Sequence, residues 1–410
     1  MIPIQPDNSP SHQTRPARVV ETYLKPGILN LSALPPLSLY LHFPWCVRKC
    51  PYCDFNSHEA SGSVPEQAYL DALRADLEQA LPLIWGRKIY TIFIGGGTPS
   101  LLSAAGLDRL MSDVRSLLPI DGAAEITMEA NPGTFEAEKF ASYAGSGINR
   151  LSIGIQSFNS QHLSALGRIH DGDEARRAID IAQANFSNIN LDLMYALPEQ
   201  TLAQAREDIA TAIGFAPSHL SLYHLTMEPN TVFAKYPPSV PDDDASAAMQ
   251  DMLAERTASA GYRHYEVSAF AQAERQARHN QNYWEFGDYL GIGAGAHSKL
   301  SFPHRVVRQA RYKQPAAYMQ HAAAGNAIAE EAEITRDELG FEFMLNASRL
   351  TEGFDVRLFS ERTGLGLNGI EQGLNLAERK GLIERDHKRI RPTALGQRFL
   401  NDLQQIFLPD

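Results

Sequence analysis

Short apolar runs that alternate with amphipathic stretches constrain the fold of this chain more than any other feature. Helical periodicity fills the gaps between these runs, as over 65–85, 107–118 and 202–215. The six predicted strands lie at 37–43, 89–94, 125–130, 150–156, 188–196 and 219–226. Strands that alternate with helices form a parallel sheet, and six such units favour a partial (β/α)6 barrel over a doubly wound sheet. We therefore expect an α/β fold with its site at the carboxyl ends of the strands.

The rest of the chain divides into segments of different character. Residues 1–36 are rich in Pro, Ser and polar residues, which predicts a mobile lead-in before a barrel over 37–300. A basic stretch predicts a solvated linker over 301–334. Its basic residues are Arg305, Arg308, Arg311 and Lys313. Helical patterns and a short hairpin then predict a mostly helical domain with a winged-helix outline over 335–410.

All three cysteines of the chain, Cys46, Cys50 and Cys53, lie within eight positions. Such concentrated thiols indicate metal ligands, because an odd number of thiols in a large chain does not suit a disulfide framework. The spacing C-x3-C-x2-C can hold three irons of a cubic iron-sulfur cluster and leave one iron open. A zinc site is the alternative, since His42 or His58 would complete a Cys3His set.

Composition limits the partners and the compartment. The chain has 410 residues and a formal net charge of -11, so no general affinity for nucleic acid is expected. No apolar run is long enough to cross a bilayer, and no charged-then-apolar leader opens the sequence. Free thiolates suit a reducing compartment, so we expect a cytoplasmic protein.

Polar and glycine residues recur where the predicted strands end. Glycines within 95–99 let the backbone approach a ligand closely, or form a tight turn. Glu129 could accept two hydrogen bonds from a ribose diol, and Gln156 and Arg168 follow the fourth strand. Asp192 lies in an apolar run, where a carboxylate is costly unless it is paired. Singly, Asp192 or Arg168 is more often half of a structural ion pair; together, these residues indicate a binding site on one rim.

These motifs resemble those of a known family. The cysteine string, with Tyr52 before its last cysteine and Gly-Gly-Gly-Thr-Pro at 95–99, resembles the radical S-adenosylmethionine (SAM) superfamily. Further strings resemble the group of oxygen-independent coproporphyrinogen III oxidases. They are Tyr-Leu-His-Phe-Pro at 40–44, Arg-Leu-Ser-Ile-Gly-Ile-Gln-Ser-Phe at 150–158 and Asp-Leu-Met-Tyr-Ala-Leu-Pro-Glu-Gln-Thr at 192–201. The resemblance runs from about residue 37 to the C-terminus.

The resemblance implies two cofactors and a set of residues that bind them. The three cysteines would hold a 4Fe-4S cluster whose open iron binds the amino and carboxylate groups of SAM, and one electron would split SAM into a 5'-deoxyadenosyl radical. The resemblance also implies a role for each matching position along SAM. Tyr40, Gly96 and Thr98 would lie along the methionine end, Tyr52 near the adenine and Glu129 at the ribose. Gln156, Arg168 and Asp192 would lie further round the rim, and Gly97 would leave room for the backbone to approach.

One departure from the oxidases decides between two branches of the group. The oxidases carry a further cysteine two positions beyond the third ligand, where this chain has Phe55. The strings Cys-Asp-Phe-Asn-Ser at 53–57 and His-Asn-Gln-Asn-Tyr-Trp at 279–284 are similar instead to the heme chaperone branch, HemW. That resemblance implies a protein that binds heme and passes it to acceptor proteins, among them membrane-associated ones, with an electron donor as a further partner.

Two alternatives stay open beside the heme chaperone. The extra cysteine is not a cluster ligand in the relatives, so its absence does not alone exclude an oxygen-independent coproporphyrinogen III dehydrogenase, and SAM cleavage is left open. A local basic excess over 379–391 within the winged-helix outline is also compatible with a zinc-dependent DNA-binding regulator. The excess is local on an acidic protein, so we rank that regulator last and expect no nucleic acid.

Two segments near residue 290 each have a functional and a structural interpretation. His279 and Tyr283 could ligate heme iron or hydrogen-bond a propionate, or they could simply close a loop. The glycine-rich string at 289–297 could let the backbone approach SAM or a porphyrin, or it could permit tight packing.

Overall fold

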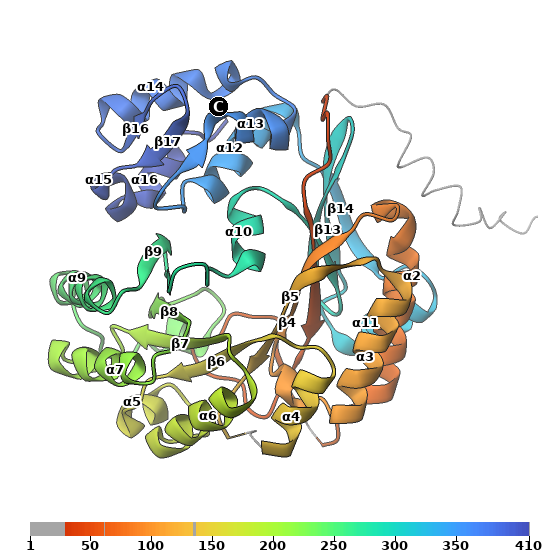
Figure 1. Ribbon diagram of the computed structural model, residues 1–410, viewed down its shortest axis with the longest axis vertical. Coiled ribbons are helices and arrows are strands. Elements are labelled where there is room, and N and C mark those ends of the chain that lie inside the picture. The colour runs from red at the N-terminus through yellow and green to blue at the C-terminus, as the bar shows by residue number, and fades with distance from the viewer. Residues whose placement is uncertain (1–28, 61, 134–136, 410) are drawn as a thin grey trace, which may run out of the picture.

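The computed structural model describes residues 29–60, 62–133 and 137–409. Most of the strands in this part of the chain join one twelve-stranded sheet, in the order β14-β13-β12-β11-β1-β4-β5-β6-β7-β8-β10-β9 (Figure 1). These strands are β1 (Leu37–Phe43), β4 (Ile89–Gly96), β5 (Ile120–Ala130), β6 (Arg150–Gln156), β7 (Ile189–Tyr195), β8 (His219–His224), β9 (Arg263–Glu266), β10 (Ala269–Ala271), β11 (Asp288–Ile292), β12 (His297–Phe302), β13 (Arg305–Arg311) and β14 (Ile328–Glu333).

The centre of this sheet is parallel. Strands β1, β4, β5, β6, β7 and β8 pair in parallel in that order, which confirms the six predicted strands and the α/β fold class. Strand β11 then pairs in parallel with the free side of β1, and β12 to β14 continue antiparallel from it. At the other edge β10 and β9 pair antiparallel to β8. The carboxyl ends of the six central strands therefore meet on one rim.

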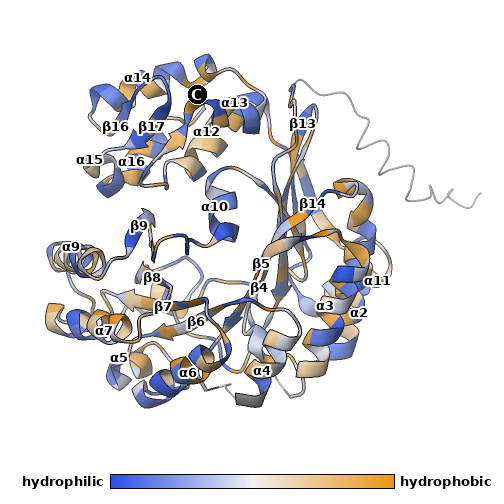
Figure 2. Ribbon diagram, in the orientation of Figure 1, coloured by the Kyte–Doolittle hydropathy of each residue, from blue (hydrophilic) through white to orange (hydrophobic). Residues whose placement is uncertain are grey.

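Helices cover the outer side of the curved sheet (Figure 1). They are α2 (Glu66–Ile84), α3 (Ala104–Leu117), α4 (Ala137–Gly145), α5 (Ser160–Ala165), α6 (Gly172–Asn185), α7 (Leu202–Gly214), α9 (Asp243–Ser259) and α11 (Pro315–Ala323). Figure 2 shows hydrophilic and hydrophobic residues mixed along these helices, as expected when each buries one face. The strands beneath them are largely buried; Leu39, Ile153 and Leu191 have no exposed surface. Burying each such side chain contributes about 1.5–3 kcal/mol to folding.

The C-terminal segment forms the predicted winged-helix outline. Its elements are α12 (Arg336–Ala347), β15 (Phe354–Asp355), α13 (Val356–Thr363), η2 (Leu367–Ile370), α14 (Glu371–Arg379), β16 (Ile383–Arg385), β17 (Arg389–Pro392), α15 (Ala394–Arg398) and α16 (Leu400–Gln405). The three short strands pair in the order β15-β17-β16, and Phe343, Phe359 and Leu374 lie in their own hydrophobic core. The predicted domain limits at residues 37 and 335 stay predictions.

The expectation of a solvated linker over 301–334 is wrong. This segment supplies β13, α11 and β14, and Arg305 and Arg311 are only 4% and 1% exposed. The Arg311 guanidinium lies 3.4 Å from the carboxylate of Asp76 on α2, so its charge is compensated inside the protein. The basic composition suggested a solvated surface because sequence alone did not reveal this partner.

The expectation of a mobile lead-in over 1–36 is wrong for residues 29–36, while residues 1–28 lie outside the described part. The Leu29 amide donates to the His304 carbonyl at 3.0 Å, and the Leu31 amide donates to the Pro303 carbonyl at 2.8 Å. Both leucines are buried in the core of the C-terminal domain. This short segment therefore holds the C-terminal domain to the barrel.

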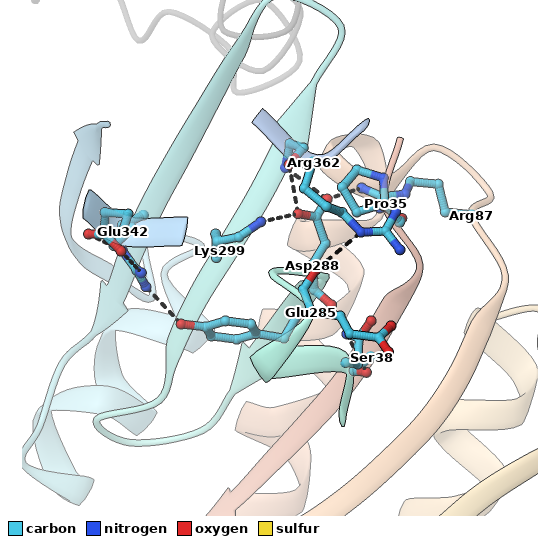
Figure 3. Close-up of polar contacts among 12 residues, drawn as sticks. Pro35, Ser38, Arg87, Glu285, Asp288, Lys299, Glu342 and Arg362 are labelled. Atoms are coloured by element: carbon cyan, nitrogen blue, oxygen red, sulfur yellow. Dashed lines mark hydrogen bonds and ion pairs between the residues drawn. The ribbon is translucent and has the colours of Figure 1, made fainter. Parts of the chain in front are cut away.

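A buried ionic network fixes the start of β11 (Figure 3). Asp288 has no exposed surface and lies 2.8 Å from both Lys299 and Arg87. Although burial acts to raise the pKa of Asp288, these two cations hold it below its ordinary value. Arg87 also donates to the Pro35 carbonyl at 2.6 Å, and Arg362 of α13 donates to the Glu285 carbonyl at 3.2 Å. The network thus links the first strand region, β11 and the C-terminal domain.

Among the residues that the structure describes, no helix has the length and apolar character needed to span a lipid bilayer.

Candidate functional site

A cavity of about 540 Å³ opens at the carboxyl ends of the six parallel strands. It brings together most of the residues that the sequence predicted for the site. The predicted residues that line it are Cys46, Cys50, Tyr52, Cys53, Gly96, Gly97, Thr98, Glu129, Gln156, Arg168 and Asp192. They come from the cysteine loop after β1 and from the ends of β4, β5, β6 and β7, so the parallel topology gathers residues that are far apart in sequence.

The cysteine loop is held by a hydrogen-bonded histidine. His42 Nε2 lies 2.9 Å from the Asn56 carbonyl, and His42 Nδ1 lies 2.9 Å from the Tyr40 hydroxyl. Because the carbonyl can only accept, Nε2 donates and Nδ1 accepts. The Asn56 amide in turn donates to the carbonyls of Ala294 and Lys313, each at 2.9 Å. Both nitrogens of His42 are therefore engaged, and the expectation that it could complete a zinc site is wrong.

The glycine loop after β4 packs directly against the cysteine segment. A side chain at Gly97 would place its Cβ 2.5 Å from the carbonyl oxygen of Trp45, in the two-residue strand β2 (Trp45–Cys46). Gly96 has a φ of +118°, and a Cβ there would lie 2.5 Å from the ring of His42. Only glycine fits both positions. The Gly96 amide also donates to Glu129 Oε2 at 3.0 Å, which ties this loop to the end of β5.

The three thiols suit an iron-sulfur cluster in type and position. Each is partly exposed, and each lines the cavity. Burial raises the pKa of Cys46 and Cys53, and Arg168 Nη1 donates a hydrogen bond to the Cys50 sulfur at 3.8 Å. No group of three or more His, Cys, Asp or Glu side chains in the described residues is arranged around a single metal ion. The fit to a cluster therefore rests on the thiol donors and the cavity that they face.

Two buried carboxylates face the middle of the cavity. Burial raises the pKa of Glu129 to about 8, with the charge of Asp192 adding to the shift. Burial also raises the pKa of Asp192, but its oxygens accept hydrogen bonds from Ser152 at 2.9 Å and Asn190 at 2.8 Å, which oppose that shift. A protonated Glu129 can donate a hydrogen bond, and both carboxyl groups have oxygens that can accept one, so the pair can bind the hydroxyl groups of a sugar.

Arg168 and Gln156 shape the rim between the carboxylates and the cysteines. Arg168 Nη2 donates to the Gly154 carbonyl at 2.7 Å and to the side chain of Asn131, which fixes the guanidinium beside Cys50. Gln156 ends β6 with a φ of +67°, a left-handed conformation that non-glycine residues seldom adopt. Strain of this kind persists only where the surroundings enforce it, and here it turns the end of the strand at the cavity.

Three predicted residues do not line this cavity: Tyr40, His279 and Tyr283. His279 is 2% exposed on α10 (Arg278–Trp284). Its Nδ1 lies 2.8 Å from the Thr91 hydroxyl, and its Nε2 lies 3.2 Å from the Tyr283 hydroxyl. Because Thr91 donates its proton to Ser38, Nδ1 of His279 donates and Nε2 accepts. Burial, with the positive charge of Arg150, lowers the pKa of His279 to about 3, so the imidazole is neutral.

The glycine-rich string at 289–297 serves packing. Gly291 lies in β11, and a Cβ at Gly293 would lie 2.5 Å from the His42 carbonyl oxygen. A Cβ at Gly295 would overlap the side chain of Asn56. None of the three glycines lines the cavity. Of the two interpretations of this string, the structure supports tight packing against the cysteine loop.

The sequence reasoning missed a deeper set of lining residues. They are Arg150, Ser152, Asn190, Ser221, Tyr223 and Asn280. Alternation along the strands could have found most of them, because every second residue of a strand faces the same side. On β6 this pattern places Arg150 and Ser152 on the same side as Gln156, and on β7 it places Asn190 beside Asp192.

Comparison with known proteins agrees with this architecture. Residues 40–212 match the Radical SAM superfamily, and residues 334–399 match the HemN C-terminal domain. The heme chaperone HemW of Haemophilus influenzae is 45% identical over 383 residues, covering 92% of this chain and 99% of that protein. HemW of Escherichia coli K12 is 45% identical over 379 residues with the same coverage. The chain belongs to the HemW family of radical SAM proteins.

Other relatives agree with this family. HemW of Bacillus subtilis is 35% identical over 380 residues, covering 90% of this chain and 99% of that protein. The solved structure of coproporphyrinogen III oxidase (HemN) from E. coli, described as a radical SAM enzyme, superposes with a TM-score of 0.79. It is 25% identical and covers 91% of this chain and 90% of that chain. Membership of the HemW family implies a 4Fe-4S cluster and SAM, and it replaces the zinc-dependent regulator considered above.

Proposed function

We propose that this protein is a heme chaperone, which binds heme and transfers it to acceptor proteins from a radical SAM scaffold. The observation that carries the proposal is the 45% identity to HemW over 92% of the chain. The cavity mouth supports it, because Phe55 lines the cavity and is 61% exposed where the porphyrinogen oxidases carry a cysteine. An exposed phenyl ring can pack against an apolar macrocycle, but it has no group that could transfer a proton.

Each lining residue would have a defined part in holding the cofactors. Cys46, Cys50 and Cys53 would bind the cluster, and the cluster with SAM supplies one-electron chemistry when both are bound. Tyr52, Gly96, Gly97, Thr98, Gln156 and Arg168 would surround SAM between the cluster and the strand ends. Glu129 and Asp192 would bind its ribose hydroxyls. Tyr40 would act indirectly, since it holds His42 and through it the cysteine loop.

The cargo and partners follow from this function. Heme is the cargo, acceptor proteins receive it, and an electron donor would reduce the cluster. We keep the cytoplasm as the expected compartment, because the thiols need a reducing environment. Direct contact of His279 with heme is not part of the proposal, since its ring nitrogens already pair with Thr91 and Tyr283.

Heme titration tests the proposal. Protein with a reconstituted cluster is titrated with heme under anaerobic conditions, and a Soret band with saturable, one-to-one binding is expected. Transfer is then measured by mixing the loaded protein with an apo-acceptor and following the shift of that band. A protein with an intact cluster that gave no Soret band would contradict the proposal.

Coproporphyrinogen III dehydrogenase is the second candidate, favoured by the superposition on HemN at a TM-score of 0.79. An anaerobic assay with SAM, a reductant and coproporphyrinogen III distinguishes the two functions. Formation of protoporphyrinogen, read by porphyrin fluorescence after oxidation, would favour the dehydrogenase. The chain is 45% identical to HemW and 25% identical to HemN, so we expect no turnover of coproporphyrinogen III.

A further inference from the structure

Arg150 is a buried arginine on the floor of the cavity, and it makes no direct ion pair with the described residues. It begins β6, is 2% exposed and lines the cavity, yet its Nε has no hydrogen-bond partner among the described residues. No ion pair joins it to a carboxylate of the described chain. An unpaired guanidinium in the interior costs several kcal/mol of folding free energy, so its retention points to an anion that enters the cavity.

The polar groups around Arg150 are already paired with one another. Asn190 donates to Ser152 at 2.7 Å and to Asp192 at 2.8 Å, and its carbonyl oxygen accepts from Ser221 at 3.0 Å and lies 2.6 Å from His219 Nδ1. The carboxylate of Asp192 is held by these neutral donors, and the positive charge of Arg150 also acts to lower its pKa. The two side chains do not form a direct ion pair in the described part of the chain, so the guanidinium can still pair with a bound carboxylate.

Arg150 lies too far from the cysteine end of the cavity to bind the methionine carboxylate of SAM. Arg150 starts β6 and Gln156 ends it, so their Cα atoms lie about 20 Å apart along the strand. The methionine carboxylate of SAM would bind iron at the cysteine end, beyond Gln156, and the adenosine end carries no anion. A carboxylate at Arg150 therefore belongs to a second molecule.

The cavity changes character from mouth to floor in a way that suits heme. Phe55 and Ile169 at the mouth are 61% and 46% exposed, and Met194 and Leu225 continue the apolar lining. Arg150 supplies the positive charge at the opposite end. Heme is an apolar macrocycle with two propionates on one edge, so it matches an apolar mouth and a cationic floor.

We propose that Arg150 binds a propionate of the heme cargo and so sets the orientation of heme in the cavity. The inference rests on the proposed heme chaperone function and adds a carboxylate subsite to it. Arginine suits this role because its planar guanidinium binds a carboxylate through two parallel hydrogen bonds.

The experiment compares three ligands with four proteins. Heme, heme dimethyl ester and SAM are titrated into cluster-loaded wild type, Arg150→Gln, Arg150→Lys and Arg305→Gln. Arg305 is the matched control, because it is 4% exposed, has two nitrogens without hydrogen-bond partners and lies outside the cavity. We expect Arg150→Gln to weaken heme binding about ten- to hundredfold, with a smaller loss for Arg150→Lys. Binding of the dimethyl ester and of SAM, and heme binding by Arg305→Gln, should stay within about twofold of wild type.

The outcomes separate this inference from the proposed function. If wild type binds no heme, both fail. If wild type binds heme and its dimethyl ester equally, the function stands and the propionate subsite fails, and this arm needs no variant that could misfold. Loss of SAM binding rather than heme binding in Arg150→Gln would assign the subsite to SAM and overturn the inference.

Discussion

At the scale of single residues, burial in and near the cavity shifts the pKa values of ionisable side chains toward their neutral forms. Glu129 lies near Asp192, and burial of both makes ionisation costly, so the protein holds Glu129 protonated at neutral pH. His279 is kept neutral by burial and by Arg150. Two guanidinium groups, those of Arg150 and Arg168, line the same cavity. The shifted pKa values of Glu129 and His279 can each be tested by substitution.

Glu129 makes stability depend on pH. Its folded pKa of about 8 lies above its ordinary value of 4.5, so the folded state retains a proton that the unfolded state releases. Stability from this group is full below about pH 4.5 and is lost as pH rises to about 8, by at most ~1.4 kcal/mol per pH unit. We expect Glu129→Gln apoprotein to lose this slope in urea unfolding between pH 5 and 8. Glu255→Gln, on the exposed surface of α9, is the control; equal slopes in wild type and Glu129→Gln would refute the assignment.

His279 supports the fold rather than the iron. Its replacement by alanine removes two buried hydrogen bonds, so the Tyr283 hydroxyl loses this partner and the Thr91 hydroxyl keeps only its bond to Ser38. We expect His279→Ala to lower the free energy of unfolding by about 2–4 kcal/mol and to leave the Soret maximum of the heme complex in place. His387→Ala, in an exposed turn, should change neither. A displaced Soret band in folded His279→Ala protein would instead restore His279 as a heme contact.

At the scale of elements, the sequence predicted what periodicity encodes. The limits of β1 and β6 agree with the predicted strands, because their apolar runs are bounded by Pro, Asn and Ser. The sequence did not predict β13, because its arginines suggested a solvated surface. The partner of Arg311 is Asp76, which lies 235 positions away in the chain. The cysteine loop was predicted from the spacing of its thiols, and the strand ends from periodicity. Alternation along β6 could have placed Arg150 on the cavity side, but the missing hydrogen bond at its Nε is visible only in three dimensions.

The contact between the glycine loop and the cysteine loop is the element-level feature most open to a test. Gly97→Ala would place a methyl group 2.5 Å from the Trp45 carbonyl and push the two loops apart. We expect a loss of about 1–3 kcal/mol in stability and less iron and sulfide bound per chain after reconstitution. Gly214→Ala, at the end of α7 with no atom within 4 Å, is the matched control. Full iron content in Gly97→Ala would show that the loops tolerate the displacement.

At the scale of the whole molecule, two hydrophobic cores are joined by several contacts, among them the ion pairs Arg308–Glu342 and Arg349–Glu266. The barrel core and the core of the C-terminal domain are separate clusters, and the segment before β1 contributes Leu29 and Leu31 to the second. The ionic network around Asp288 adds a polar link between the same parts (Figure 3). The segment before β1 is therefore one of several contacts between the barrel and the C-terminal domain, and it buries two leucines in the C-terminal core.

Leu31 tests that contact. It is 6% exposed, and its replacement by alanine leaves a cavity in the C-terminal core. We expect Leu31→Ala to cost about 2–4 kcal/mol and to make the C-terminal domain cleave faster than the barrel in limited proteolysis. Leu408→Ala, at a position 52% exposed, should behave as wild type. Uniform destabilisation, with no difference in cleavage between the two parts, would show that the cores unfold as one unit.

The hydrogen bonds of Asn56 also bear on when the protein can mature. This residue sits in the cysteine loop near the start of the chain, but its amide binds carbonyls of Ala294 and Lys313, 238 and 257 positions later. During synthesis the chain emerges from its N-terminus, so the loop lacks these partners until more than three quarters of the protein has been made. Metal delivered earlier would meet thiols that are not yet held in place. We therefore expect cofactor insertion to follow the synthesis of residue 313.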